Sequence, residues 1–308
     1  MTECLRGDGL RWRSGPFIIH AIADAPGLVE PMRRLYAYHE ILTTPYRDVA
    51  DFHLELARGQ WLRRWFRPTI HFLPTGRASG SPMAPFPLDH ALPLLEWGQN
   101  WCIASRANHY LMLHAGVVAK KGKALLLPGT PGSGKSTLAA ALSLSGWQLL
   151  SDEFALLHPY SGRLHPLARP VALKNESIQA VRDFSNKAVI GPEFPKTRKG
   201  TVAHLRPPKE SVDLVDRVID PVCVVRPVFK AAAPTTVQPL PKDNGFLILA
   251  RNAFNFEMQG KRGFRAVERV IGKCDSFEMV FGQLDEAVAA LEEIFASSVK
   301  KDCGSPLR

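Results

Sequence analysis

The chain has 308 residues, of which 45% are hydrophobic, a composition typical of a globular protein with one large domain or two modest ones. No stretch approaches the roughly eighteen consecutive apolar residues of a membrane span, and charges and prolines interrupt the region where a signal peptide needs an apolar run. Five cysteines occur without CxxC spacing, so neither a disulfide framework nor a zinc site is indicated. We expect a cytoplasmic protein whose formal net charge of +10 favours acidic partners, such as nucleotide phosphates, an acidic peptide or nucleic acid.

Residues 1–108 predict a small, strand-rich N-terminal domain. The apolar run at 16–20 predicts a strand, prolines interrupt residues 82–87, and residues 92–108 favour a helix. Residues 61–67 interleave aromatic side chains with arginines, a pattern that can suit nucleic acid or a membrane but more often packs its aromatics inward. We predict no nucleic-acid partner and no membrane partner.

A β-hairpin is predicted next. Apolar runs at residues 110–119 and 124–128 flank a lysine- and glycine-containing turn at residues 120–123. Paired residues then have numbers that sum to about 243, which places His114 opposite Gly129. His114 could hydrogen-bond Asp152 and tune its basicity, contact a phosphate when protonated, or be a core histidine satisfied by a backbone carbonyl.

The hairpin leads into a phosphate-binding motif. Residues 129–136 fit GxxxxGK[ST], and they lie between the apolar strand at 124–127 and a helix-forming run from Thr137. Glycines let successive backbone N–H groups turn toward phosphates, and the helix N-terminus adds its positive end. We expect Lys135 to bridge the terminal phosphates and Ser136 to bind Mg²⁺. The predicted nucleotide-binding residues are Gly129, Thr130, Pro131, Gly132, Ser133, Gly134, Lys135, Ser136 and Thr137.

An acidic pair follows the loop after one helix and one strand. The predicted helix at 135–145 is stopped by Gly146, and the strand covers residues 147–151. The helix descends about 16 Å at ~1.5 Å per residue, and the strand climbs back about as far at ~3.3 Å per residue. A right-handed crossover makes this strand parallel to the one before the loop, so Asp152 and Glu153 return to the phosphate level and are expected at the carboxyl edge of the sheet, where α/β proteins bind ligands. Such a pair can also cap a turn, but beside a phosphate loop we predict Asp152 as the catalytic base and Glu153 as a metal ligand.

The rest of residues 109–299 completes a predicted P-loop domain. Prolines break the apolar runs of residues 156–240, which predicts short strands and long loops. Residues 284–299 have helical periodicity, and residues 300–308 are expected to form a disordered tail.

Positive charge is concentrated in the loop at residues 196–209. Such a run is usually solvated surface, but it could also clamp the substrate or a phosphate during phosphoryl transfer. Lys199 and Arg206 are the residues that we expect to contribute, and Arg206 is our candidate for a catalytic arginine.

Three segments resemble the HPr serine kinase/phosphorylase family and its phosphoenolpyruvate carboxykinase-like P-loop fold. They are residues 113–118, 129–137 and 149–153, which carry the histidine, the phosphate loop and the acidic pair in the family's order. The resemblance implies that His114 and Asp152 take part in proton transfer and that Ser136 and the second acid lie near the metal. It also makes a homo-oligomer an expectation.

A closer resemblance, over nearly the whole chain, is to the family called HPr-kinase-related kinase A, whose members look like companions of peptide-modification genes. The segments that carry it are residues 15–17, 51–53, 95–102, 169–178, 199–208 and 252–255. The implied fold is a mixed α/β structure with an HPr kinase C-terminal-like P-loop domain and a smaller strand-rich N-terminal domain.

The chain departs from the kinase/phosphorylase pattern in two respects. Its second acid is Glu153 rather than aspartate, and the family's downstream glycine-rich signature is missing, which argues against reverse phosphorolysis. Glu176 is the nearest candidate for a metal-side glutamate, although it could equally be an exposed residue at the start of the helix that follows from Ser177.

The function predicted from these features is transfer of the γ-phosphoryl group of ATP, with Mg²⁺, to a hydroxyl group, serine on a protein or peptide. A P-loop ATPase is an alternative, in which Glu153 polarises water and Asp152 serves the metal. A nucleotide-sensing scaffold that binds a peptide without chemistry is another.

Overall fold

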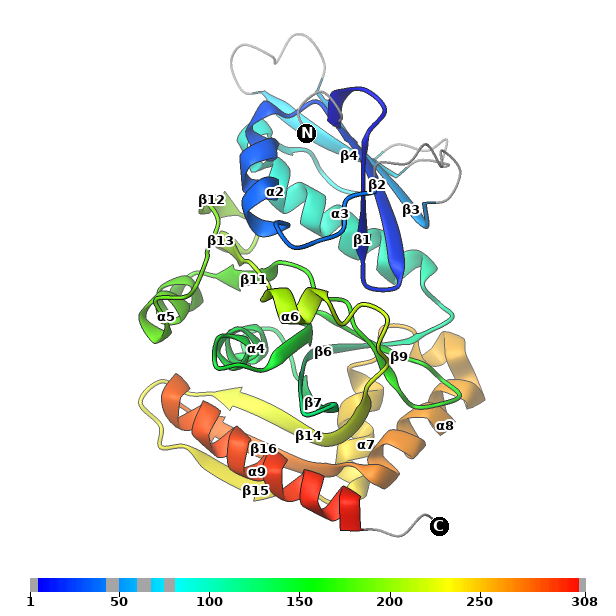
Figure 1. Cartoon of the computed structure of the whole chain (residues 1–308), viewed down its shortest axis with the longest axis vertical. Helices are drawn as coiled ribbons and strands as arrows, with labels where there is room; N and C mark the ends of the chain where they lie inside the picture. Colours follow the sequence, from blue (N-terminus) through cyan, green and yellow to red (C-terminus); the bar gives the residue numbers. More distant parts are fainter. Residues whose placement is uncertain (1–4, 43–49, 60–67, 75–80, 305–308) are drawn as a thin grey trace.

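The computed structural model describes residues 5–42, 50–59, 68–74 and 81–304. These residues form a mixed α/β protein built on three sheets, with the N-terminal sheet at one end of the long axis and the C-terminal helix near the other (Figure 1). The predicted mixed α/β class is confirmed.

The N-terminal part contains a five-stranded sheet of order β1-β2-β3-β4-β5. Its β2 and β3 strands are parallel, and the other neighbours are antiparallel. The elements are β1 Leu10–Ser14, β2 Phe17–Ala23, η1 Pro26–Leu28, α2 Val29–Leu35, β3 Phe52–Arg58, β4 Thr69–Pro74, β5 Phe86–Pro87, η3 Leu88–His90 and α3 Ala91–Arg106.

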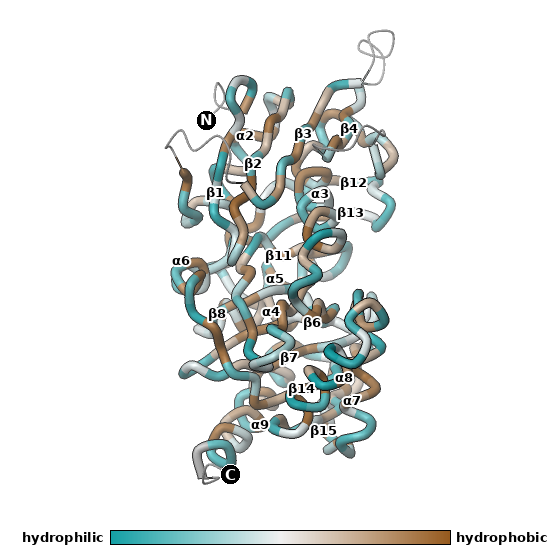
Figure 2. The backbone as a smooth tube through the Cα atoms, turned by 90° about the vertical axis from the view of Figure 1, so that its right-hand side faces the viewer, coloured by the Kyte–Doolittle hydropathy of each residue, from teal (hydrophilic) through white to brown (hydrophobic). Residues whose placement is uncertain are grey.

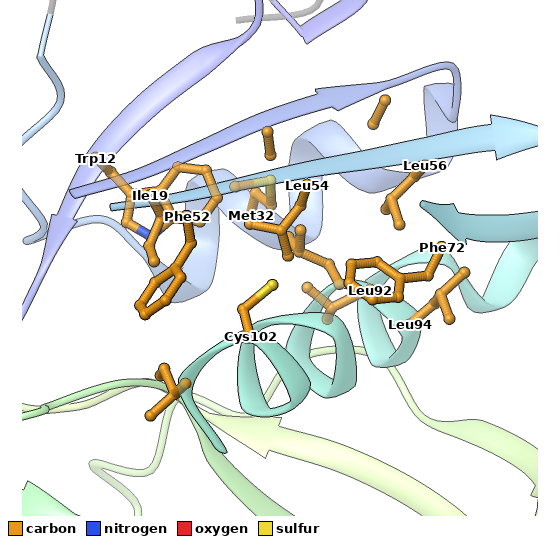
Figure 3. Close-up of a cluster of buried hydrophobic side chains, with 14 of the residues drawn as sticks. Trp12, Ile19, Met32, Phe52, Leu54, Leu56, Phe72, Leu92, Leu94 and Cys102 are labelled. Carbon is orange, nitrogen blue, oxygen red and sulfur yellow. The ribbon is translucent and has the colours of Figure 1, made fainter. Parts of the chain in front are cut away.

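An apolar core joins this sheet to α3. Alternate residues of β1 are buried, as expected for a strand with one covered face. Trp12, Leu54 and Phe72 from the sheet share the core with Leu94 and Cys102 of α3 (Figure 3). The strand-rich N-terminal region predicted from the sequence therefore has a substantial core of its own.

That core continues past the predicted boundary at residue 108. Leu156, Leu167 and Phe194 belong to the same buried cluster as the N-terminal residues. The two parts of the chain thus share one apolar core.

An eight-stranded sheet forms the centre of the molecule. Its order is β10-β9-β6-β7-β14-β16-β15, and β8 pairs with β6 alongside β9. Strands β7, β14 and β16 are parallel, whereas the β6–β7 hairpin is antiparallel. The strands are β6 Leu111–Lys120, β7 Lys123–Pro128, β8 Gln148–Ser151, β9 Phe154–Leu157, β10 Leu164–His165, β14 Asp220–Phe229, β15 Thr236–Pro239 and β16 Asp275–Phe281.

Helices cover both faces of the central sheet. One core contains residues of α4 (Lys135–Leu144) and α9 (Leu284–Gly304), and the other contains residues of α7 (Lys242–Arg251) and α8 (Phe256–Lys273). Consecutive residues of β7 alternate between them, Leu125 in the first core and Leu126 in the second. A strand covered on both faces is apolar throughout, which explains the uninterrupted run before the phosphate loop.

A three-stranded sheet of order β11-β13-β12 lies between these two parts (Figures 1 and 2). Its β13 is antiparallel to both neighbours. The elements are β11 Val171–Lys174, α5 Glu176–Phe184, β12 Phe194–Thr197, β13 Gly200–Leu205 and α6 Lys209–Val212.

The element predictions are largely confirmed. The predicted hairpin turns where expected, since Lys120 pairs with Lys123, and its ladder extends to Ala115 and Pro128. In the region expected to hold only short strands, β14 is ten residues long, because it is the central parallel strand of the sheet.

The prediction of a disordered tail from residue 300 is wrong for residues 300–304. Helix α9 continues to Gly304, and Lys301 in its last turns forms an ion pair of 3.0 Å with Asp275.

Residues 305–308 and residues 61–67, which interleave arginines with aromatics, lie outside the described residues. None of the described helices is long and apolar enough to cross a membrane.

Candidate active site

The phosphate loop predicted at residues 129–136 connects the end of β7 to the start of α4. Gly132 and Gly134 have φ of +87° and +88°, a left-handed conformation that glycine adopts without steric cost. No side chain caps the first turn of α4, so in the described structure the N–H groups after Gly134 are open to an anion. The positive end of the helix dipole favours the same anion.

Lys135 is the first residue of α4 and is only 6% exposed. Burial lowers its pKa, and so do Lys174 and Lys199, whereas Glu153 and Asp152 raise it. Among the described residues, no carboxylate lies within the 4.0 Å of an ion pair with its ammonium group. Because a buried charge without a partner is costly, this arrangement suits an anion supplied by a ligand.

The acidic pair lies at the level of the loop. Both β7 and β8 are antiparallel to β6, so they run in the same direction, as predicted, but β6 separates them. Pro128 pairs with Ala115, and Ser151 pairs with Val117 close by on β6. The loop and the acidic pair therefore meet beside the same stretch of β6.

The acidic pair does not lie at the carboxyl edge of the sheet. At such an edge the chain would leave the sheet after the pair, but here it does not. It continues as β9, which also pairs with β6, and the pair forms the break between β8 and β9. Ser151 fixes this break, since its Oγ accepts hydrogen bonds from the backbone N–H groups of Glu153 (3.3 Å) and Phe154 (3.0 Å).

Asp152 is buried, with 4% of its surface exposed. Its Oδ2 accepts a hydrogen bond of 3.0 Å from the backbone N–H of Ala172. Burial and the neighbouring Glu153 raise its pKa to about 6, although Ala172, Arg169 and Lys174 act in the opposite direction. A carboxylate with a pKa near the working pH is suited to accept a proton.

His114 faces Glu153 rather than Asp152. Its Nε2 lies 4.0 Å from Oε1 of Glu153, and both side chains are about four-fifths buried. Burial lowers the pKa of His114, and Lys135 lowers it further. The expected hydrogen bond between His114 and Asp152 is therefore not among the described contacts; His114 lies beside Glu153 instead.

A loop before α8 holds His114 from the other side. The backbone N–H of His114 donates a 2.6 Å hydrogen bond to the carbonyl of Asn252. The ring of Phe254 stacks on the imidazole, with centroids 5.3 Å apart and an interplanar angle of 25°. Asn255 anchors this loop by accepting a hydrogen bond from the N–H of Met112 and donating to the carbonyl of Tyr110. Residues 252–255 are one of the segments that resemble the HPr-kinase-related kinase A family, but the sequence analysis did not predict that they lie at the site.

The structure brings Lys174 and Lys199 to the site but not Arg206. Lys174 ends β11 and Lys199 lies in the β12–β13 turn, and the pKa of Lys199 is lowered by burial and then by Lys174. Arg206 follows the opposite end of β13, roughly 20 Å away at ~3.3 Å per residue. Its guanidinium lies 4.7 Å from the ring centre of Tyr38. Of the two residues predicted to clamp the substrate or a phosphate, only Lys199 lies near the phosphate loop. Lys174 also lies there and was not predicted.

Two of the predicted metal ligands fit Mg²⁺, and the third does not. Ser136 lies in the first turn of α4, and Glu153 lies beside Lys135. Mg²⁺ is commonly bound by one or two protein oxygens together with phosphates and waters, so these two suffice beside a nucleotide. Glu176 is exposed at the start of α5, with no described contact to either. The described residues contain no cluster of three His, Cys, Asp or Glu side chains that could hold a metal alone.

A buried polar network connects Asp152 with the N-terminal part, and sequence reasoning missed it. Arg169 is 4% exposed, lowers the pKa of Asp152, and donates a hydrogen bond to Oδ1 of Asn100 on α3. Also on α3, Glu96 accepts a hydrogen bond from the hydroxyl of Tyr36, and burial raises its pKa to about 7. The available signal was Arg169 itself, an arginine within an apolar, proline-rich segment.

Two surface clefts lie away from these residues. One of about 690 Å³ lies between α2 and the segment after α5, and one of about 260 Å³ lies between the N-terminal part and α6. The phosphate loop and the acidic pair line neither of them. We identify the candidate site from its charges and backbone geometry rather than from the depth of a cleft.

Comparison with known proteins adds no family assignment, since no family model and no curated protein matches the chain.

Proposed function

We propose that the protein is a P-loop kinase that transfers the γ-phosphoryl group of ATP to a hydroxyl group, with serine on a protein or peptide as the acceptor. The observation that carries this proposal is Lys135, which is buried within a glycine-rich loop at a helix N-terminus and has no carboxylate at ion-pair distance in the described part of the chain. Lys174 and Lys199 add positive charge, and Asp152 adds a buried carboxylate at the same place. Anion binding and proton acceptance are the two capacities that phosphoryl transfer to a hydroxyl requires.

In the proposed reaction the acceptor oxygen attacks the γ-phosphorus while Asp152 takes the hydroxyl proton. The new oxygen–phosphorus bond forms as the bond to the β-phosphate oxygen breaks, and ADP leaves. Lys135, with Lys174 and Lys199, stabilises the negative charge on the transferring group. Mg²⁺, held by Ser136 and Glu153, would neutralise charge on the β- and γ-phosphates.

The resemblance to HPr kinase-type proteins supports the same proposal. The order of His114, the phosphate loop and the acidic pair is the order in that family, and the antiparallel hairpin before the loop is compatible with a phosphoenolpyruvate carboxykinase-like P-loop fold. We extend the proposal to that fold, to a cytoplasmic location and to a peptide-modification setting.

Labelled ATP tests the function directly. The full chain is incubated with γ-labelled ATP, Mg²⁺ and a library of serine-containing peptides, with a matched library in which alanine replaces serine. We expect label on the serine library only. Lys135→Ala should abolish transfer, while Lys273→Ala, at an exposed lysine of α8, should leave it unchanged. Label found only as free phosphate would favour an ATPase, and bound nucleotide without either product would favour a nucleotide-sensing scaffold.

ATP hydrolysis is the second candidate function, and the position of Glu153 favours it. This carboxylate is more exposed than Asp152, lies beside His114, and is the acid that most raises the pKa of Lys135. A water molecule could reach it more easily than it could reach buried Asp152. The two functions assign opposite roles to the two acids, so substitution of each distinguishes them.

A further inference from the structure

The two sides of the phosphate loop differ chemically. On one side, β6 and the β8–β9 break carry His114, Asp152 and Glu153. On the other side β14 pairs with β7 in parallel, and its carboxyl end lies against the loop. A Cβ atom added to Gly129 would lie 3.8 Å from the ring of Pro227, and one added to Gly134 would lie 3.4 Å from Cβ of Phe229.

Phe229 is the last residue of β14, and 46% of it is exposed although it contacts the loop. Its ring packs against Phe281, which is buried, with centroids 5.5 Å apart. The next residue, Lys230, donates a backbone hydrogen bond of 2.9 Å to the carbonyl of Phe281. Phe229 is thus an anchored aromatic side chain whose ring remains half free beside the loop.

We infer that Phe229 forms the stacking surface for the base of the bound nucleotide. The inference rests on the proposed function, in which the γ-phosphate faces Asp152 and Glu153. The nucleoside is at the other end of the phosphate chain, so it leaves the loop away from the acids, on the side of β14. An aromatic ring presents a face to any base, and stacking of this kind does not read hydrogen-bonding edges. The ligand class is a nucleoside triphosphate with either purine.

The test compares ligands with and without a base. Dissociation constants of the Mg²⁺ complexes of ATP, GTP and inorganic tripolyphosphate are measured by calorimetry on the full chain. Phe229→Ala should weaken the binding of ATP and of GTP by about tenfold each, or about 1.4 kcal/mol, because the contact with the stacked base is lost. Tripolyphosphate affinity should not change. Phe229→Trp, which keeps an aromatic face, should retain nucleotide affinity.

Phe264→Ala is the matched control. Phe264 lies on α8, is 50% exposed, and packs against Phe246 at a centroid distance of 4.8 Å, so it resembles Phe229 in exposure and packing. Its loss should affect none of the three ligands. Equal weakening of tripolyphosphate and ATP by Phe229→Ala, or no weakening of ATP, would overturn the inference. A wild-type chain that binds neither ATP nor tripolyphosphate would instead refute the proposed function.

Discussion

Asp152 and Glu153 are consecutive residues in different surroundings. Asp152 is buried and accepts a backbone hydrogen bond, whereas Glu153 is partly exposed beside His114. The break between β8 and β9 causes this difference, because it turns successive side chains toward different neighbours. Two carboxylates with unlike environments can divide proton transfer and metal binding between them.

Substitution of each acid separates the two roles. Asp152→Asn keeps the shape and can still accept the hydrogen bond from Ala172, but it cannot accept the hydroxyl proton. Nucleotide should still bind, while phosphoryl transfer falls by ~10²- to 10⁴-fold, the range for losing a general base. Glu153→Gln should instead raise the Mg²⁺ concentration needed for half-maximal rate. Transfer rates measured against Mg²⁺ concentration check both expectations, and an exchange of phenotypes would favour the ATPase.

The pH profile reports on Asp152. Burial raises its pKa to about 6, and the base must be deprotonated to act, so kcat/KM should fall as the pH drops through about 6. Arg169 lowers this pKa, so Arg169→Met should move the midpoint to higher pH. Arg169→Lys keeps the charge and should leave the midpoint lower than in Arg169→Met. Equal midpoints in these two folded variants would mean that the charge of Arg169 does not act on the base.

At the scale of elements, the phosphate loop depends on how closely α4 approaches its neighbours. Gly134 combines φ of +88° with a position where a Cβ atom would lie 2.6 Å from the ring of Phe281. Both features exclude a side chain, the first through backbone strain and the second through contact with a buried ring.

Gly134→Ala should therefore weaken nucleotide binding by at least about tenfold and destabilise the fold by on the order of 1–2 kcal/mol. Gly272→Ala is its control, because Gly272 lies in α8 and, outside that helix's own backbone and the adjacent residues, no described atom lies within 4 Å of the added Cβ. Alanine there should stabilise the helix by about 0.5–1 kcal/mol and leave binding unchanged. Calorimetric affinity and denaturant midpoints measure both effects; normal ATP affinity in Gly134→Ala would contradict the close approach seen here.

At the scale of the whole molecule, the shared core couples the N-terminal sheet to the P-loop part. Five of the six tryptophans precede residue 109, so intrinsic fluorescence reports mainly on the N-terminal part, whereas far-ultraviolet circular dichroism reports on the whole chain. Because Leu156, Leu167 and Phe194 belong to the N-terminal core, both signals should change in one transition.

MgATP should raise the midpoint of both signals together. A ligand at a hundredfold excess over its Kd stabilises the native state by about 2.7 kcal/mol, which corresponds to roughly 4 °C for 308 residues at an unfolding entropy of ~2.1 cal/mol/K per residue. The measurement is a thermal scan with and without MgATP, with Lys135→Ala as the control that should show no shift. If the fluorescence midpoint differs from the dichroism midpoint and does not change with MgATP, the N-terminal part folds independently.

The parts of the site that depend on local geometry could be predicted from the amino-acid sequence. The glycines, Lys135 and Ser136 lie where the motif predicted, because the loop is defined by consecutive residues between a strand and a helix. Counting residues along α4 and β8 was enough to return Asp152 to the loop, since the rise per residue of each element is fixed. The hairpin register followed from its turn for the same reason.

The residues that come to the site from distant parts of the chain could not be predicted, because their positions depend on how the sheets pack. Lys199 and Arg206 belong to one basic segment, but they lie at opposite ends of β13. Lys199 therefore lies near the phosphate loop, whereas Arg206 contacts the ring of Tyr38. Lys174, Arg169, Phe254 and Phe229 arrive on strands and loops whose pairing depends on the packing of whole sheets. Long-range pairing is set by which apolar faces are buried together, and no local pattern in the sequence encodes it.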